Sequence, residues 1–232
     1  MAAMGVGFTA ANGETHVFPE TVPVPGGRLV FPEENGSNRT VPIAPFRIGR
    51  TPVTNREYAP LLAAGRAGAP PWWTDPDFRA PRQPVVGVTW NEAMTFCAWL
   101  AEIAGGRWRL PTEYEWEFAA SGGLESPKTA WGDAVPPGEI PDGPIAGPWE
   151  VGRGTPNGYG LCDAGTIVHE WCLNWREPDP PASPVSAPER RASRGGSWRH
   201  RIRWSPPSAK SSLRPDSRYS DFGFRVLRER DG

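Results

Sequence analysis

"RWRLPTEYEWEFAA", residues 107–120, contains the clearest helix start in this sequence. Thr112 is followed three residues later by Glu115, which is the spacing of a capping box. In this motif the threonine side chain accepts a hydrogen bond from a backbone N–H of the first turn, and the glutamate accepts one from the threonine N–H. Trp116 opens an apolar face, and Gly122 is a typical residue to end a helix. The stretch therefore predicts a short helix that begins after Thr112.

The same capping-box spacing occurs twice earlier in the chain. Thr54 and Thr89 each have a glutamate three residues later. Behind Thr89, apolar residues recur at helical spacing as far as Gly105, so a longer helix is predicted there. The helix behind Thr54 is expected to stop near Gly65. Three helices, each with its own start signal, are thus predicted between residues 54 and 122.

The rest of the chain lacks helical periodicity. Residues 22–53 alternate short apolar runs with turn residues, which is typical of short strands. Further strand candidates are 194–198 and 222–227, whereas 123–160 and the proline-rich stretch 177–189 predict irregular surface segments. Because no tandem repeat or linker is found, we expect a single, loop-rich α+β domain.

The composition favours a folded domain with an aromatic core. Only 38% of the 232 residues are hydrophobic, but 12 of them are tryptophans, each of which can bury a large area. The net charge of −1 gives no long-range attraction to nucleic acid or to an acidic membrane. No apolar run is long enough to span a bilayer. Nucleic-acid and membrane partners are therefore not expected.

The start of the chain and the cysteines indicate a reducing compartment. The first residues lack the basic and apolar regions of a signal peptide. The three cysteines, Cys97, Cys162 and Cys172, form no disulfide framework. We therefore expect a cytoplasmic protein with free thiols.

Six stretches of the chain form a recognisable series. They are RIGRTPVTNREYAPL (47–61), QPVVGVTWNEAMTFCAWL (83–100), RWRLPTEYEWEFAA (107–120), PNGYGLCDAGTIVHEW (156–171), RASRGGSW (191–198) and RPDSRYSDFGFRV (214–226). Taken in this order, they resemble the formylglycine-generating-enzyme, or sulfatase-modifying-factor, domain family. The resemblance covers residues 22–228, which leaves 1–21 as an N-terminal extension and 229–232 as a C-terminal tail. It implies a variant of the C-type-lectin fold with little regular secondary structure.

One departure from the family concerns its copper site. In the family's enzymes, two cysteines shortly after GGSW bind copper(I) and, with oxygen, convert a substrate cysteine to formylglycine; soft thiolates suit copper(I). In this chain no cysteine follows Cys172, and the two positions fall at about His200 and Ser205. The sequence is therefore not expected to be a copper-dependent cysteine oxidase.

A second departure concerns two histidines. The family usually has GLYDMAGNVWEW where this chain has GLCDAGTIVHEW, so His169 replaces a tryptophan that the resemblance places beside the cysteine pair. His169 and His200 are thus expected in one pocket, where they could bind iron or copper with Asp221, or form an acid–base pair. Ser197 and Ser205 complete the candidate catalytic residues. The alternative is that His169 fills the space of the lost indole and His200 is solvated.

The resemblance also implies a calcium site. Family members often hold calcium in the segment that here reads LCDAGTIVHEW. Asp163, Glu170 and the carbonyl of Gly165 match this pattern and are oxygen ligands of the kind that calcium prefers. However, the usual asparagine is here Ile167. The alternative is that the two carboxylates cap turns or pair with arginines.

The arginines after GGSW suggest a ligand clamp. If the segment is extended, alternation places Arg199, Arg201 and Arg203 on one side, where their guanidinium groups could bind carboxylate or phosphate. Trp198 and Trp204 could stack on a ring-bearing ligand. Arg109, Glu113, Glu115 and Arg225 match scaffold positions of the family and are expected in buried ion pairs.

Three functions remain open on these grounds. The first is a divergent, metal-dependent oxidase or tailoring enzyme that acts on a small molecule or peptide through His169 and His200. The second is a lectin-like binding module, such as the variable proteins of diversity-generating retroelements, with 199–222 as its binding face. The third is a catalytically silent relative of the copper enzymes.

Overall fold

The computed structural model describes residues 7–9, 15–32, 37–136, 141, 145–175 and 190–230. Its three helices are α1 (Asn55–Ala63), α2 (Trp90–Ala104) and α3 (Glu113–Ala120). Each begins at the predicted threonine with both hydrogen bonds of the capping box in place. Each also ends within two residues of the predicted glycine. The helix predictions are therefore confirmed.

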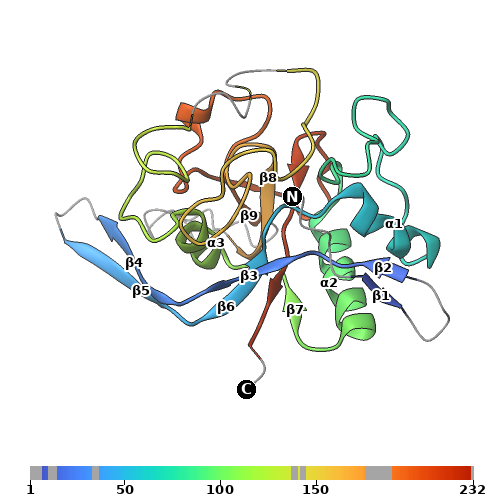
Figure 1. Ribbon diagram of the computed structural model, residues 1–232, viewed down its shortest axis with the longest axis horizontal. Coiled ribbons are helices and arrows are strands. Elements are labelled where there is room, and N and C mark those ends of the chain that lie inside the picture. The colour runs from blue at the N-terminus through green and yellow to red at the C-terminus, as the bar shows by residue number, and fades with distance from the viewer. Residues whose placement is uncertain are drawn as a thin grey trace.

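Within the described ranges, the strands form two four-stranded sheets and two hairpins (Figure 1). One sheet has the order β3-β6-β12-β7 and is antiparallel; the other has the order β10-β9-β8-β11, with β11 parallel to β8. The hairpins are β1-β2 and β4-β5. The strands are β1 (Gly7–Thr9), β2 (Thr15–Val17), β3 (Thr21–Val24), β4 (Gly27–Pro32), β5 (Asn38–Ile43), β6 (Phe46–Gly49), β7 (Trp108–Arg109), β8 (His169–Trp175), β9 (Arg191–Arg194), β10 (Lys210–Leu213), β11 (Phe222–Gly223) and β12 (Leu227–Arg228).

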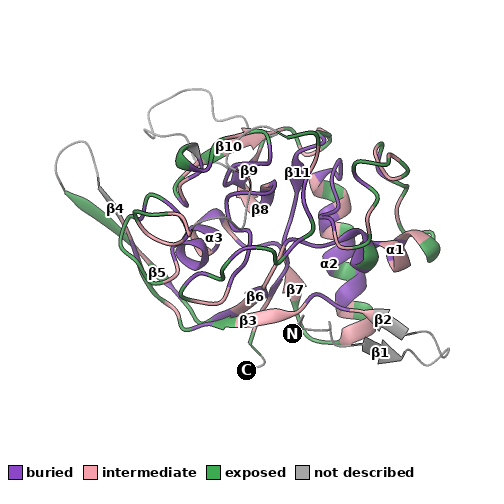
Figure 2. Cartoon of the chain, turned by 45° about the horizontal axis from the view of Figure 1, so that its top comes forward, coloured by how far each residue is buried: buried purple, intermediate pink, exposed green. Residues whose placement is uncertain are grey.

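Large aromatic side chains build the core, as the composition predicts. Trp116 and Trp171 are almost completely buried, and each belongs to a different apolar cluster. In Figure 2, the buried residues concentrate on α2, α3 and the sheet that contains β8, β9 and β11. Phe18 packs in the same cluster as Trp171, so the packed body begins before residue 22. Long loops cover this core, including the described parts of 123–160, which form turns and bends.

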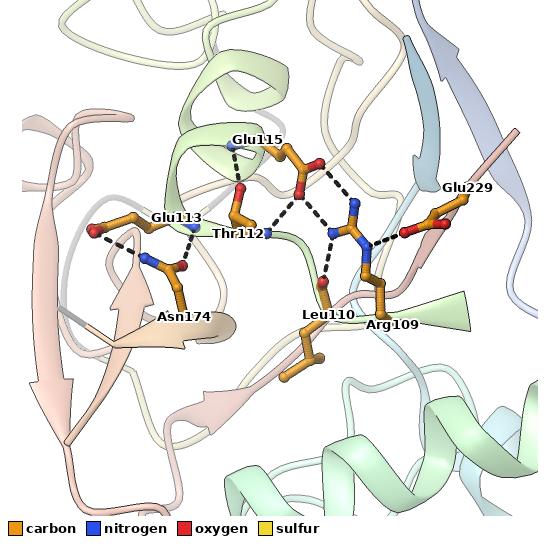
Figure 3. Close-up of polar contacts among 7 residues, drawn as sticks. All are labelled: Arg109, Leu110, Thr112, Glu113, Glu115, Asn174 and Glu229. Atoms are coloured by element: carbon orange, nitrogen blue, oxygen red, sulfur yellow. Dashed lines mark hydrogen bonds and ion pairs between the residues drawn. The ribbon is translucent and has the colours of Figure 1, made fainter. Parts of the chain in front are cut away.

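Buried and partly buried ion pairs connect α3 to the sheets. Arg109 binds the Glu115 carboxylate through two nitrogens, at 2.7 and 2.8 Å, and also contacts Glu229 at 2.8 Å (Figure 3). Glu113 accepts from Asn174 and pairs with the buried Arg194 at 3.0 Å. The expected buried pairing is confirmed for Glu113, whereas the Arg109–Glu115 pair is only partly buried, with side chains 23% and 16% exposed. No helix among the described residues is both long and apolar enough to cross a membrane.

The strand predicted at 194–198 is wrong beyond its first residue. β9 ends at Arg194, because Gly195 has φ of +75° and turns the backbone out of the sheet. Residues 198–200 form a turn, and a short 3₁₀ helix follows at Ile202–Trp204. The segment is therefore not extended, and the expected alternation of its arginines along one side does not occur. The proline-rich stretch 177–189 lies outside the described residues.

Candidate functional site

A pocket of about 570 Å³ opens where β8 and β11 begin. β11 pairs in parallel with the start of β8, and the His169 N–H donates to the Asp221 carbonyl at 2.9 Å. This register places the first side chain of β8 beside the segment 218–222. The turn after β9 closes the pocket with Arg199 and His200. The described lining residues are Trp72, His169, Arg199, His200, Ser211, Leu213, Arg218, Tyr219, Ser220, Asp221 and Phe222.

His169 is held in a single neutral form. Its Nδ1 lies 2.7 Å from the Gly195 carbonyl oxygen, which can only accept a hydrogen bond, so Nδ1 carries a proton. Nε2 then carries the lone pair of the neutral ring. Burial lowers the pKa of His169, although the nearby Asp221 carboxylate acts in the opposite direction. His169 therefore presents a proton acceptor to the pocket.

His200 is held in the opposite tautomer. The Ser197 backbone N–H donates to His200 Nδ1 at 3.3 Å, so Nδ1 carries the lone pair and Nε2 the proton. The rings of His169 and His200 lie edge to face, with their centroids 5.2 Å apart. The structure thus brings together the two histidines that the resemblance placed in one pocket. His169 can accept a proton, and His200 can donate a hydrogen bond.

Asp221 lies beside both histidines and is largely buried. Its Oδ2 accepts from the Ser197 hydroxyl at 3.0 Å and lies 4.0 Å from His169 Nε2. Arg199 Nε is 3.7 Å from the same oxygen, and an Arg199 Nη donates to the Ser220 hydroxyl at 2.7 Å. Asp221 thereby links the candidate site residues into one polar network. Ser197 serves this network by orienting the carboxylate.

The other residues predicted around GGSW lie in different places. Trp198 is buried, packs edge-on against Phe78 at 6.0 Å and does not face the pocket. Arg201 and Arg203 are exposed and lie outside the described pocket lining. The side chain of Trp204 is outside the described part of the chain. Of the predicted arginine clamp, only Arg199 therefore reaches the pocket.

Ser205 packs against Gly196 and is not among the described residues that line the pocket. A Cβ added at Gly196 would lie 1.8 Å from the Ser205 hydroxyl oxygen. The Gly196 N–H also donates to the Gly165 carbonyl at 3.1 Å, so three chain segments meet closely here. Ser205 is thus a packing partner of the GGSW turn.

Glu170, a candidate calcium ligand, is occupied by other groups. Arg225 donates to both of its oxygens, at 2.5 and 2.8 Å, and the Trp116 indole donates to Oε2 at 2.6 Å. Both Glu170 and Arg225 have fully buried side chains. Arg225 also donates to the carbonyls of Gly49 and Cys162. The carboxylate therefore has a cationic partner already.

The other two calcium candidates are also engaged. Asp163 accepts from the Gly152 N–H at 2.6 Å and from the Trp149 indole at 3.3 Å. The Gly165 carbonyl accepts from Gly196. Each of the three candidate calcium ligands thus already accepts hydrogen bonds from other groups of the chain. Within the described ranges, no group of three or more His, Cys, Asp or Glu side chains is arranged to hold a metal.

Seven of the described lining residues were not named as individual site residues from the sequence: Trp72, Ser211, Leu213, Arg218, Tyr219, Ser220 and Phe222. Arg218 contacts the Glu92 carboxylate at 2.6 and 2.7 Å, and so ties the segment after β10 to the start of α2. Tyr219 is 47% exposed at the rim, and Trp72 comes from a distant loop. All of them except Trp72 lie within 199–222, the segment that the binding-module hypothesis names as its binding face. Nothing local marks Trp72.

Comparison with known proteins identifies the family. The "sulfatase-modifying factor enzyme 1-like domain" matches residues 8–230. The formylglycine-generating enzyme of Streptomyces coelicolor is 29% identical, over 90% of this chain and 89% of that protein. The inactive C-alpha-formylglycine-generating enzyme 2 of Mus musculus is also 29% identical, over 89% of this chain and 85% of that protein.

Two solved structures share the fold. Treponema denticola variable protein 1 superposes with a TM-score of 0.73 at 20% identity, over 99% of this chain and 100% of that one. PvdO from Pseudomonas aeruginosa gives a TM-score of 0.74 at 24% identity, with the same coverage. The α+β, C-type-lectin-like fold expected from the sequence is confirmed. This chain belongs to the sulfatase-modifying factor, or formylglycine-generating-enzyme, domain family.

Proposed function

We propose that this chain is a tailoring enzyme that binds a small molecule or a peptide beside His169 and transfers a proton there. The observation that carries the proposal is the hydrogen bond from His169 Nδ1 to the Gly195 carbonyl. It fixes the ring so that the Nε2 lone pair faces the pocket. The cysteine pair of the family's copper chemistry is absent, so the proposed reaction does not use it.

The two histidines have different roles in the proposed proton transfer. His169 Nε2 accepts a proton from the ligand, and the Asp221 carboxylate 4.0 Å away stabilises the resulting positive charge. The Nε2–H of His200 is available to donate to a neighbouring oxygen or nitrogen of the ligand. Because its pKa is lowered, His169 is neutral and ready to accept at pH 7.

A binding module is the second candidate function. The rim of the same pocket carries an arginine and a tyrosine that are partly open to solvent, Arg199 at 52% of its side chain and Tyr219 at 47%. An arginine beside an aromatic ring is suited to ligand recognition without chemistry. One of the relatives is named as inactive. This name supports the idea of a family member that binds a ligand without catalysing a reaction.

The binding of iron, copper or calcium by this chain stays a prediction. The carboxylates of the calcium segment already accept from Arg225, Trp116, Trp149 and Gly152. Binding a metal through His200 would require its Nδ1 contact to Ser197 to be lost or the ring to turn. No step of the proposed reaction therefore depends on a metal, and metal analysis of the purified protein tests the earlier expectation directly.

A ligand screen with paired variants tests the proposal. Amines, thiols, carboxylates and short peptides are screened for a rise in melting temperature. Each hit is then incubated with the protein in deuterium oxide and examined by mass spectrometry, because removal and return of a carbon-bound proton replaces it with deuterium. His169→Gln removes the proton acceptor and keeps much of the size. Arg199→Ala and Arg201→Ala form a matched pair, because only Arg199 lines the pocket.

The expected hit stabilises the wild type and Arg201→Ala, binds Arg199→Ala more weakly, and is converted by the wild type but not by His169→Gln. A ligand that binds in the same way but is recovered unchanged from the wild type supports the binding module. Ligands whose binding and conversion are the same in wild type, His169→Gln and Arg199→Ala contradict the proposed site.

A further inference from the structure

A second pocket of about 470 Å³ lies between the β4-β5 hairpin and α3. In Figure 1 the hairpin extends away from the body, and its base packs against α3. The described lining of this pocket shares no residue with that of the His169 pocket. Its apolar walls come from Leu29, Phe118, Leu124, Pro127, Tyr159 and Pro207.

Two aromatic rings give this pocket a defined shape. The rings of Phe118 and Tyr159 have centroids 5.7 Å apart and are inclined by 33°. Leu124 lines the same pocket and is 48% exposed, so part of its apolar side chain is open to a ligand. An organic group could therefore bury apolar surface between side chains that are already in place.

The floor of the pocket carries a buried carboxylate. The side chain of Glu117 is only 10% exposed, and its Oε2 lies 2.8 Å from Arg194 Nη1. No hydrogen bond of good geometry reaches this Oε2 from the described residues, so Arg194 compensates it as an ion pair alone. Burial raises the pKa of Glu117, with Arg194 acting in the opposite direction. The carboxylate is thus incompletely compensated where it lines the pocket.

The charged side chains around the floor of this pocket do not balance one another. Arg194 also binds Glu113 at 3.0 Å, so one buried guanidinium serves two carboxylates. Lys210 favours the charged form of Glu117 but is exposed, and solvent screens it. At the mouth, Arg28 and Glu125 are exposed and of opposite sign. The floor therefore has an excess of negative charge that a ligand cation would balance.

We propose that this second pocket binds a primary ammonium ion attached to a compact aromatic or aliphatic body. The ammonium group donates to Glu117, and the body lies against Phe118, Tyr159 and Leu124. A charge-assisted hydrogen bond at a buried carboxylate and the burial of apolar surface both favour such a ligand. The aromatic walls also attract a cation electrostatically.

Benzylamine is the probe for this site, with benzyl alcohol and benzoate as neutral and anionic controls of similar size. Binding is measured by NMR titration of the purified chain at pH 7. We expect benzylamine to shift resonances of this pocket and to bind about tenfold or more tightly than either control. Glu117→Gln is expected to remove this preference. His169→Gln should leave it unchanged, which separates this site from the proposed function.

A surface variant keeps the test decisive if Glu117→Gln does not fold. Leu124→Arg places a positive charge at the mouth of the pocket and changes an exposed residue. Ile145→Arg is its control, because Ile145 is 37% exposed and does not line the pocket. Benzylamine binding should weaken in Leu124→Arg alone. Equal binding of benzylamine and benzyl alcohol, or benzylamine binding that Leu124→Arg leaves unchanged, would overturn the proposal.

Discussion

At the scale of single residues, His169 makes the stability of the fold depend on pH. Its folded pKa lies below the value of about 6.5 for an unfolded chain, so between the two values the unfolded chain binds more protons. The contribution of His169 to the free energy of unfolding is therefore fully present above pH 6.5. It is lost as the pH falls from 6.5 toward the folded pKa. In urea titrations from pH 7.5 to 5, wild type should lose more stability than His169→Gln.

Comparison with the variant is necessary because other groups favour the folded state as the pH falls. Asp163 and Glu117 have pKa values raised by burial, so at low pH they are protonated more readily in the folded chain. Both are present in wild type and variant, and their contributions cancel in the difference. Parallel stability curves for the two proteins would contradict the predicted pKa of His169.

Single residues also show where sequence reasoning ends. The family pattern indicated that His169 and His200 lie close together, but it could not reveal which ring nitrogen carries the proton. That depends on the Gly195 carbonyl and the Ser197 N–H, which only the folded backbone positions. Likewise, Glu170 matches a calcium pattern in sequence, whereas its partner Arg225 is 55 residues away.

At the scale of elements, the capping boxes carry a measurable share of stability. In α2, the Thr89 side chain accepts from the Glu92 N–H at 3.1 Å, and the Thr89 N–H donates back to the Glu92 carboxylate at 2.9 Å. Thr89→Ala should lower the free energy of unfolding by about 1 kcal/mol. Thr89→Ser keeps the hydroxyl and should stay close to wild type. The midpoint of urea unfolding measures both, and equal losses would show that the cap contributes nothing.

Helices were predictable and short strands were not, for a physical reason. A capping box is a local signal, because its donors and acceptors lie within four residues of one another. Strands such as β11 and β12 have two residues each and are defined by partners elsewhere in the chain. At 194–198 the local pattern favoured a strand, but the close approach of Gly196 to Ser205 requires a turn.

At the scale of the whole molecule, Arg225 joins the two sheets. It binds Glu170 in β8 of one sheet and the carbonyl of Gly49 in β6 of the other. It also reaches the carbonyl of Cys162 in the loop that precedes β8. Since the two sheets share this buried group, we expect them to unfold together in one transition.

Replacing this arginine tests both its energy and its connecting role. Arg225→Met leaves Glu170 as an unpaired buried charge, which should cost about 3–5 kcal/mol. The matched control is Arg66→Met, because the Arg66–Glu102 pair is 54% exposed on both sides and should contribute about 1 kcal/mol or less. Urea unfolding is followed by tryptophan fluorescence and far-UV circular dichroism. Wild-type curves should coincide. Separate transitions would show that the sheets are independent, and equal losses in the two variants would show that the Arg225–Glu170 pair does not connect them energetically.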